Sequence, residues 1–309
     1  MLPTRQGSVR LFRFLGIDVF LHWSWFLVAV YEVLNRPKAY SSFVWNVLEY
    51  VALFGIVLMH EFGHSLACRQ VGGQADQIIL WPLGGVAFVA PPQRPGATLW
   101  SIAAGPLVNV VLAPALTVLV FFGAAVGWHI SMPNFYKFLH SIWQVNLVLL
   151  IFNLLPIYPL DGGQILRSIL WFPLGRARSL LVAAIVGFPC VGAMLLVAVF
   201  WVHDTLFAFM CLFILLNCWR GLMQARLLAK LAKIPRRQGF ACPACREAPI
   251  LGAAWRCSNC HRPFDMFESQ GLCPQCGVTY PELQCLDCGS ARPLAEWVAP
   301  GVASAPPRI

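Results

Sequence analysis

Long runs of apolar residues are the feature that most constrains the fold of this chain. A helix that crosses a bilayer needs roughly 20 mostly apolar residues, and six stretches meet that requirement. They run over about residues 17–34, 46–68, 99–127, 139–158, 179–202 and 205–222. Only 11% of the residues are charged, whereas about 25% are charged in a typical soluble domain. The sequence therefore predicts an all-α membrane protein with about six transmembrane helices.

The basic residues predict the orientation of these helices. With the N-terminus in the cytosol, fourteen Lys and Arg residues fall inside and three fall outside, namely Arg36, Lys38 and Lys137. This asymmetry follows the positive-inside rule and explains the net charge of +9 without a nucleic-acid partner. Both termini are expected in the cytosol, with basic helix ends meeting anionic headgroups of the lipid bilayer.

A short segment between the second and third apolar stretches is expected to form a β-hairpin embedded in the membrane. Residues 77–90 are too few to span, and Gly84 and Gly85 lie at their middle, between two arms typical of strands. Backbone at membrane depth must be paired or line a wet cavity, so the hairpin is expected beside a functional site. The alternative is a plain interfacial loop.

The motif His60-Glu-Phe-Gly-His64, near the cytosolic end of the second stretch, indicates a metal site. Positions i and i+4 share one helix face, so both imidazoles can bind one zinc ion. Glu61 beside them can act as a general base that takes a proton from water. Ionisable residues inside a membrane are costly and indicate function. The alternative is a set of buried polar groups that only join helices.

A catalytic zinc ion needs a third protein ligand, and Asp161 is the candidate. Glu49 precedes His60 by about 16 Å of helix at 1.5 Å per residue. Glu32 lies at the outer end of the first stretch, and Asp18 lies at its cytosolic start. Asp161 follows the fourth stretch on the cytosolic side, as the histidines do. A simple turn carboxylate is the alternative, because Asp-Gly-Gly is itself a turn signal.

Together these motifs resemble the site-2 protease family of intramembrane zinc metalloproteases. The likeness covers about residues 16–178, and its most specific part is Asn-Leu-Leu-Pro…Leu-Asp-Gly-Gly at 153–163. Gly-Pro-Leu-Val-Asn at 105–109 and Pro-Leu-Gly-Gly at 82–85 add to it. By this resemblance the catalytic zinc is bound by His60, His64 and Asp161, and Glu61 is the catalytic base.

The resemblance implies hydrolysis of peptide bonds in or near transmembrane segments of membrane-protein substrates, that is, regulated intramembrane proteolysis. Asn153 matches a family asparagine that holds substrate near the metal, and it could donate to the oxyanion. Hydrogen bonding between helices is the alternative role for Asn153 and the role expected for Asn109. An unwound substrate segment is expected to add as a strand to the hairpin.

Two other functions fit the same residues. A metal carrier would place ligands at several depths and would not need Glu61, so zinc flux that survives Glu61→Gln would favour it. A proteolytically inactive tether that displays the C-terminal module would lose its function when residues 238–309 are deleted, but not through Glu61→Gln.

Eight cysteines after residue 240 form four C-x-x-C pairs, which predict a small zinc-ribbon domain with two structural zinc ions. Sequential pairing assigns one site to Cys242, Cys245, Cys257 and Cys260 and another to Cys273, Cys276, Cys285 and Cys288. Thiolate ligands persist in a reducing cytosol. The ribbon is slightly acidic, so nucleic acid is not expected. A cytosolic protein partner is preferred over a cap without any partner.

The chain is therefore expected to divide into five parts. These are a cytosolic segment (1–15), a transmembrane metalloprotease domain (16–223), a basic linker (224–241), a double zinc ribbon (242–290) and a disordered tail rich in Pro and Ala (291–309).

Overall fold

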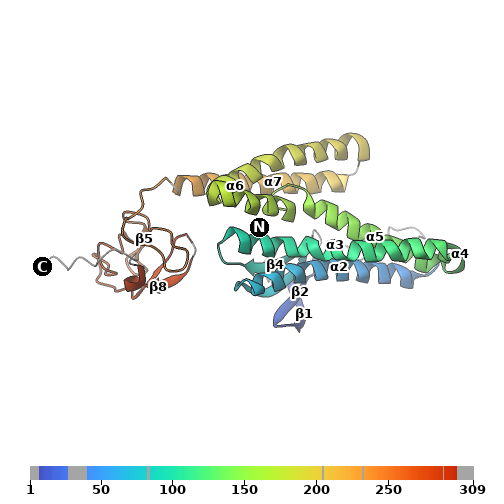
Figure 1. Ribbon diagram of the computed structural model, residues 1–309, viewed down its shortest axis with the longest axis horizontal. Helices are drawn as coiled ribbons and strands as arrows, with labels where there is room; N and C mark the ends of the chain where they lie inside the picture. The colour runs from blue at the N-terminus through green and yellow to red at the C-terminus, as the bar shows by residue number, and fades with distance from the viewer. Residues whose placement is uncertain are drawn as a thin grey trace. The chain divides into compact units, whose positions relative to one another are not determined.

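The computed structural model describes residues 7–26, 40–81, 84–203, 205–231, 233–287 and 289–297. The chain forms two units, Met1–Arg226 and Leu227–Ile309. The first unit contains the long helices and a small β-sheet, and the second contains short strands joined by loops (Figure 1).

Within the described residues, five helices are long and apolar enough to cross a membrane. They are α2 (Phe43–Gln70), α3 (Pro95–Ala125), α5 (Pro133–Leu154), α6 (Asp161–Val197) and α7 (Thr205–Leu231). The short helix α4 (Trp128–Ser131) precedes α5, and the π-helical turn η1 (Ala198–Val202) follows α6. These helices account for five of the six apolar stretches, so a multi-span helical protein is confirmed and the sixth span stays a prediction.

The first apolar stretch does not begin as a helix, so that part of the prediction is wrong. Strand β2 (Ile17–His22) occupies its start, and residues 27–39 lie outside the described residues. Ile17 and Val19 are fully buried while Asp18 between them is partly exposed, an alternation with period two. The helix was predicted from the length of the apolar run alone, whereas the alternating burial in β2 is typical of a strand.

β2 belongs to a four-stranded sheet with the order β1-β2-β3-β4. β1 (Ser8–Phe14) pairs antiparallel with β2, which pairs parallel with β3 (Gln74–Trp81). β3 and β4 (Gly84–Ala90) pair antiparallel, which confirms the predicted hairpin, although residues 82–83 of its turn lie outside the description. β4 forms one edge of this sheet.

Two interruptions shape the long helices. Pro106 and Pro114 lie inside α3, and proline inside a helix removes a backbone hydrogen bond. α6 is interrupted at Gly175, whose φ of 76° and ψ of 172° are not helical. The segment of α6 before Gly175 carries Asp161 at its first position, and the segment after it, continued by η1, covers the predicted span at 179–202.

The second unit contains two small hairpins around a core of aromatic side chains and cysteines. β5 (Trp255–Arg256) pairs with β6 (Pro263–Phe264), and β7 (Glu282–Gln284) pairs with β8 (Ala291–Pro293). The turn η2 (Leu294–Trp297) follows β8.

The expected disordered tail is wrong for its first seven residues, because 291–297 form β8 and η2. Trp297 is 1% exposed, and its ring packs against Phe267 with ring centroids 5.7 Å apart. The N–H of Ala241 also donates to the carbonyl of Trp297 at 2.8 Å. The buried Trp297 side chain therefore orders residues 291–297, although this part of the chain is rich in Pro and Ala. Residues 298–309 lie outside the described residues.

Candidate active site

His60, Glu61 and His64 lie on α2 and are buried, with 3%, 6% and 5% of their surface exposed. The four-residue spacing places both imidazoles on one side of the helix. Gly63 between them permits a close crossing with α3, because a Cβ added there would lie 2.6 Å from the carbonyl oxygen of Ala104. The motif therefore sits where α2 and α3 approach each other closely.

Asp161 is brought to the histidines by the connection between α5 and α6. α5 ends at Leu154, and residues 155–160 lead into Asp161 at the first position of α6. The backbone of this connection passes so close to Gly162 and Gly163 that a Cβ at either position would collide with it. The two glycines therefore allow the compact turn that presents the carboxylate.

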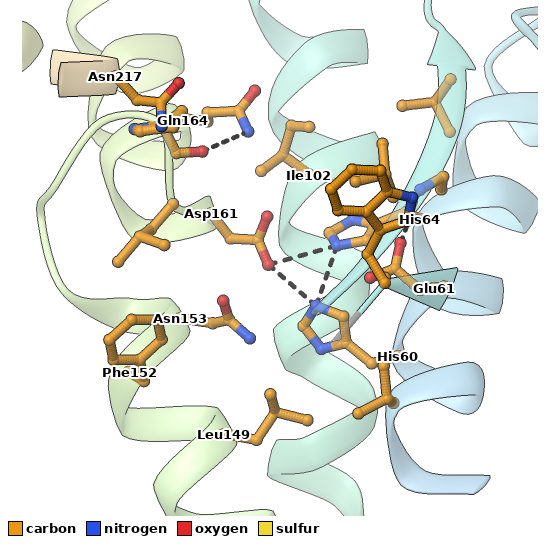
Figure 2. A pocket seen from close by; sticks show the side chains of 18 of the residues that line it. His60, Glu61, His64, Ile102, Leu149, Phe152, Asn153, Asp161, Gln164 and Asn217 are labelled. Atoms are coloured by element: carbon orange, nitrogen blue, oxygen red, sulfur yellow. Dashed lines mark hydrogen bonds and ion pairs between the residues drawn. The ribbon is translucent and has the colours of Figure 1, made fainter. Parts of the chain in front are cut away.

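Three ligand atoms converge from α2 and α6. Asp161 Oδ2 lies 3.0 Å from His60 Nε2 and 3.3 Å from His64 Nε2, and the two Nε2 atoms are 3.1 Å apart (Figure 2). A tetrahedral zinc ion with ligands at about 2.0–2.1 Å holds its donor atoms about 3.3 Å apart. The three atoms therefore have the separations that zinc requires.

The hydrogen bonds on the far side of the imidazoles also fit a cation. His64 Nδ1 lies 2.9 Å from the carbonyl oxygen of Ser101, which can only accept, so Nδ1 carries the proton. His60 Nδ1 lies 2.7 Å from Asn109 Oδ1, another acceptor. In neutral imidazoles both Nε2 lone pairs then face the Asp161 carboxylate. Three electron-rich atoms in mutual contact fit a metal ion between them.

Glu61 stands apart from this three-atom group. Its Oε2 accepts a hydrogen bond from the backbone N–H of Ala87 on β4 at 2.8 Å. A Cβ at Gly85 would collide with the Glu61 carboxyl group, so glycine is required for this close approach. The carboxylate is therefore tied to the sheet, beside the ligand group, where it can accept a proton from a nearby water.

A cavity of about 530 Å³ opens beside these residues. Its walls are mostly apolar, and it is lined by residues of α2, β3, β4, α3, α5, α6 and α7 and of the connection before α6. Three carboxamide residues also line it, namely Asn153 of α5, Gln164 of α6 and Asn217 of α7 (Figure 2). The structure thus places Asn153 at the same cavity as the metal-ligand group, as the sequence suggested.

Gln164 and Asn217 were missed by the sequence analysis, although both left a signal. Gln164 follows Asp161 by three residues and therefore lies on the same helix face. Asn217 is a polar residue within an otherwise apolar span, where polar side chains usually face the protein interior. Its Nδ2 donates to the carbonyl of Phe213 at 2.8 Å, one turn earlier in α7.

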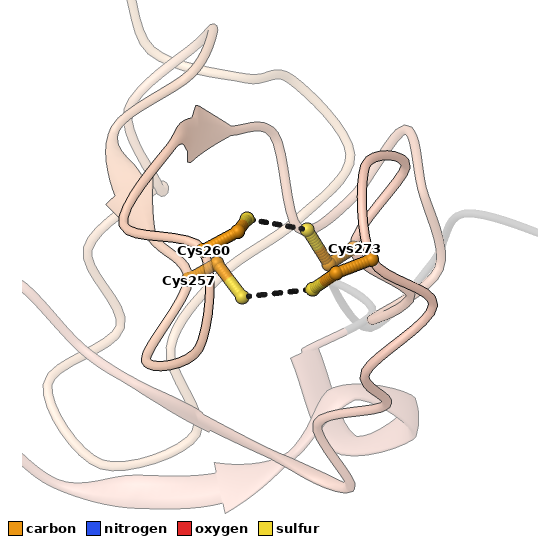
Figure 3. Close-up of side chains that lie close together, drawn as sticks. Cys257, Cys260 and Cys273 are labelled. Atoms are coloured by element: carbon orange, nitrogen blue, oxygen red, sulfur yellow. Dashed lines mark hydrogen bonds between the residues drawn. The ribbon is translucent and has the colours of Figure 1, made fainter.

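The ribbon cysteines form two groups. In the first, Sγ of Cys257 lies 3.4 Å from Sγ of Cys276, and Sγ of Cys260 lies 3.6 Å from Sγ of Cys273 (Figure 3). Zinc–sulfur bonds of about 2.3 Å in a tetrahedron place sulfur atoms about 3.8 Å apart. These four thiols therefore fit a structural zinc ion.

The second group contains Cys242, Cys245 and Cys285, with Cys245 Sγ and Cys285 Sγ 3.8 Å apart. Cys288, the fourth cysteine expected nearby, lies outside the described residues.

The expected sequential pairing of the cysteine pairs differs from this arrangement. The two inner pairs (257/260 and 273/276) meet each other, and the first pair (242/245) meets Cys285 of the last. β5 precedes the 257/260 pair and β6 follows it, so this hairpin encloses that pair. The spacing of C-x-x-C pairs does not encode which pairs meet, so the tertiary fold decides the pairing.

One hydrogen bond in the ribbon favours a thiolate. The Tyr280 hydroxyl donates to Cys257 Sγ at 3.2 Å, and this bond, together with weaker effects of the backbone N–H groups of Cys260 and Asn259, lowers the pKa of that thiol to about 5. A hydrogen bond to the charged form favours deprotonation, and zinc binds the thiolate.

Comparisons with known proteins agree with the motifs. The model of peptidase family M50 matches residues 49–132 and 124–199. A zinc metalloprotease of Methanocaldococcus jannaschii is 36% identical over 180 residues, which cover 58% of this chain and 50% of that protein. A putative zinc metalloprotease of Synechocystis sp. is 30% identical over 194 residues, covering 59% and 49%. The chain thus spans about half the length of these curated relatives.

One solved structure is matched over nearly its whole length, in contrast to the two relatives above. The site-2 protease from M. jannaschii superposes with a TM-score of 0.52 at 31% sequence identity, covering 70% of this chain and 95% of that chain.

Proposed function

The chain belongs to peptidase family M50, the site-2 proteases, and from that premise we propose that it is an intramembrane zinc metalloprotease. It is a multi-pass membrane protein, and its proposed substrates are membrane proteins cut in or near their transmembrane segments. The observation that carries the proposal is the geometry of three ligand atoms 3.0–3.3 Å apart with a separate buried carboxylate beside them. A tether without activity would not need such an arrangement.

His60, His64 and Asp161 would hold the catalytic zinc ion, because their ligand atoms have the separations described above. When bound, zinc supplies Lewis acidity that activates water for attack and polarises the scissile carbonyl group. Glu61 accepts the proton of the attacking water and later delivers it to the leaving amine. Asn153 faces the cavity and donates from its amide to the substrate carbonyl oxygen.

The edge of β4 is the proposed docking site for unwound substrate. The N–H of Ala87 donates to Glu61. Because backbone groups alternate in direction along an antiparallel ladder, the backbone N–H and C=O groups of Gly85 and Ala87 then point away from β3. Both residues line the cavity. A substrate strand added to this edge would satisfy its own backbone groups and would place a peptide bond beside Glu61.

The ribbon is proposed to hold two structural zinc ions and to dock a cytosolic protein partner. The two cysteine groups support the metal count, which together with the catalytic ion gives three per chain. The distribution of Lys and Arg and the need for reduced thiolates support a cytosolic ribbon and cytosolic termini.

The proposed protease activity is tested with Glu61→Gln in the full-length chain. Loss of the base should lower cleavage of an unfolded probe such as fluorescently labelled casein by about 10²-fold or more, and uncut substrates should accumulate in the membrane proteome. Glu49→Gln is the matched control, because Glu49 is a buried carboxylate on the same helix that accepts from the Ser141 hydroxyl and does not line the cavity. Equal cleavage by the wild type and Glu61→Gln would refute the proposed activity.

A further inference from the structure

Two asparagines lie behind His60 and are completely buried. Asn109 of α3 and Asn146 of α5 are both 0% exposed, and neither lines the active-site cavity. Asn109 Oδ1 lies 2.7 Å from His60 Nδ1, and Asn146 is hydrogen-bonded to Asn109. Buried amides need defined partners, so their orientation can be deduced from the hydrogen bonds.

The hydrogen bonds fix both amide groups in one orientation. Asn146 Nδ2 donates to the backbone carbonyl of Asn109 at 3.1 Å, and a carbonyl can only accept. The Oδ1 of Asn146 must therefore be its other end, and it accepts from Asn109 Nδ2 at 2.8 Å. With its Nδ2 used in this way, Asn109 is left with Oδ1 toward His60.

The orientation of Asn109 decides which nitrogen of His60 can bind a metal ion. With Oδ1 facing the ring, Nδ1 carries the proton and Nε2 presents its lone pair to Asp161 and His64. If the Asn109 amide turned round, its NH₂ group would face Nδ1, and the neutral ring would then carry its proton on Nε2. A protonated Nε2 cannot be a ligand.

We propose that Asn146 is a positioning residue of the metal site, which holds the Asn109 amide in the orientation that keeps His60 Nε2 free to bind the ion. Asn109 is the direct hydrogen-bond partner of His60, and Asn146 supports Asn109 from a third helix. This role replaces the purely structural one expected for Asn109. The proposal rests on the proposed metal site.

The test compares four variants of the full-length protein, and a His64→Ala reference, at a series of buffered free zinc concentrations. The His64→Ala variant lacks a ligand of the catalytic site, but its ribbon keeps its zinc. The catalytic metal is therefore the zinc content per chain minus the zinc content per chain of His64→Ala. Loss of a partner behind a metal ligand lowers affinity about 10–100-fold. Asn109→Leu should show a loss of that size, and Asn146→Leu a loss of about 10-fold at the lower end of that range.

The matched control is Thr117→Val. Trp143 Nε1 of α5 donates to Thr117 Oγ1 of α3 at 2.9 Å, so this variant removes a hydrogen bond between the same two helices away from the site. It should leave zinc affinity unchanged. If it lowers affinity as much as Asn146→Leu does, the two asparagines act only by joining helices and the proposal is overturned.

Rescue by a conservative change gives a second criterion. Asn109→Asp breaks the bond to Asn146 Oδ1 but keeps an acceptor for the N–H of His60 Nδ1. Its zinc affinity should therefore stay within about 3-fold of the wild type, a much smaller loss than the 10–100-fold expected for Asn109→Leu. Equal losses for Asp and Leu would contradict the proposal. A wild type that binds no more zinc than His64→Ala would instead contradict the metal site itself, and with it the proposed function.

Discussion

The backbone N–H of Ala87 on β4 donates to Oε2 of Glu61 on α2, with 2.8 Å between nitrogen and oxygen. The proposed base is thereby held by the same strand edge that is proposed to receive the substrate. This bond holds the carboxylate at the wall of the cavity that His60, His64 and Asp161 also line, where it can take part in proton transfer.

Replacing Ala87 by Pro tests this tether. Proline removes the N–H, which faces away from β3, so the hairpin should persist. A displaced base should lower kcat on the order of 10²-fold while zinc content stays at the wild-type level. The measurements are casein cleavage and zinc per chain. Full activity in Ala87→Pro would show that the tether does not position Glu61.

Gly105 of α3 should be essential for the metal site. A Cβ at this position would collide with the His64 ring, so Gly105→Ala should displace that ligand and weaken zinc binding about 10–100-fold. Gly96→Ala on the same helix is the control, because its added Cβ would meet only Phe172 Cζ, at 3.9 Å. Zinc affinity is the measurement, and equal affinity of the two variants would contradict the close packing of Gly105 on His64.

The helices and the grouping of His60, His64 and Asp161 could be predicted from the sequence, and the assignment of this group to zinc stays a prediction. The separation of His60 and His64 is a property of one helix, and Asp161 directly follows a short connection, in a sequence with strong turn signals. The sheet at β1 and β2 could not be predicted in the same way. The apolar length of residues 17–34 hid the alternation at Ile17, whose burial depends on pairing with a distant strand.

The polar partners of the site needed tertiary information. Asn146 and Asn217 are single polar residues in apolar spans, and the sequence alone cannot say which neighbour each one meets. The cysteine pairs posed the same problem, because four C-x-x-C pairs allow several combinations.

The arrangement of the ribbon cysteines makes a prediction about thiol reactivity. In Cys257→Ala, the thiols of Cys260, Cys273 and Cys276 should become reactive toward an alkylating reagent together, because they share a zinc ion. Cys242 and Cys245 should stay protected. Peptide mass spectrometry after brief alkylation measures both sets. Exposure of Cys242 and Cys245, with protection of Cys273 and Cys276, would support the sequential pairing instead.

Trp297 should stabilise the ribbon although it lies in a Pro- and Ala-rich segment. Its side chain is almost fully buried against Phe267, and loss of a buried Trp side chain costs about 3–5 kcal/mol. Trp297→Ala should therefore make the ribbon thiols reactive at lower urea concentrations. Deletion of residues 298–309 is the control, and an unchanged urea midpoint in Trp297→Ala would contradict the anchor.

Zinc per chain in the full-length protein and in Asp161→Ala tests the central claim most directly. One ion held jointly by α2 and α6 predicts three zinc ions in the wild type and two in the variant, with the ribbon thiols equally protected in both. Equal zinc counts in the two proteins would contradict the claim that Asp161 completes a catalytic metal site.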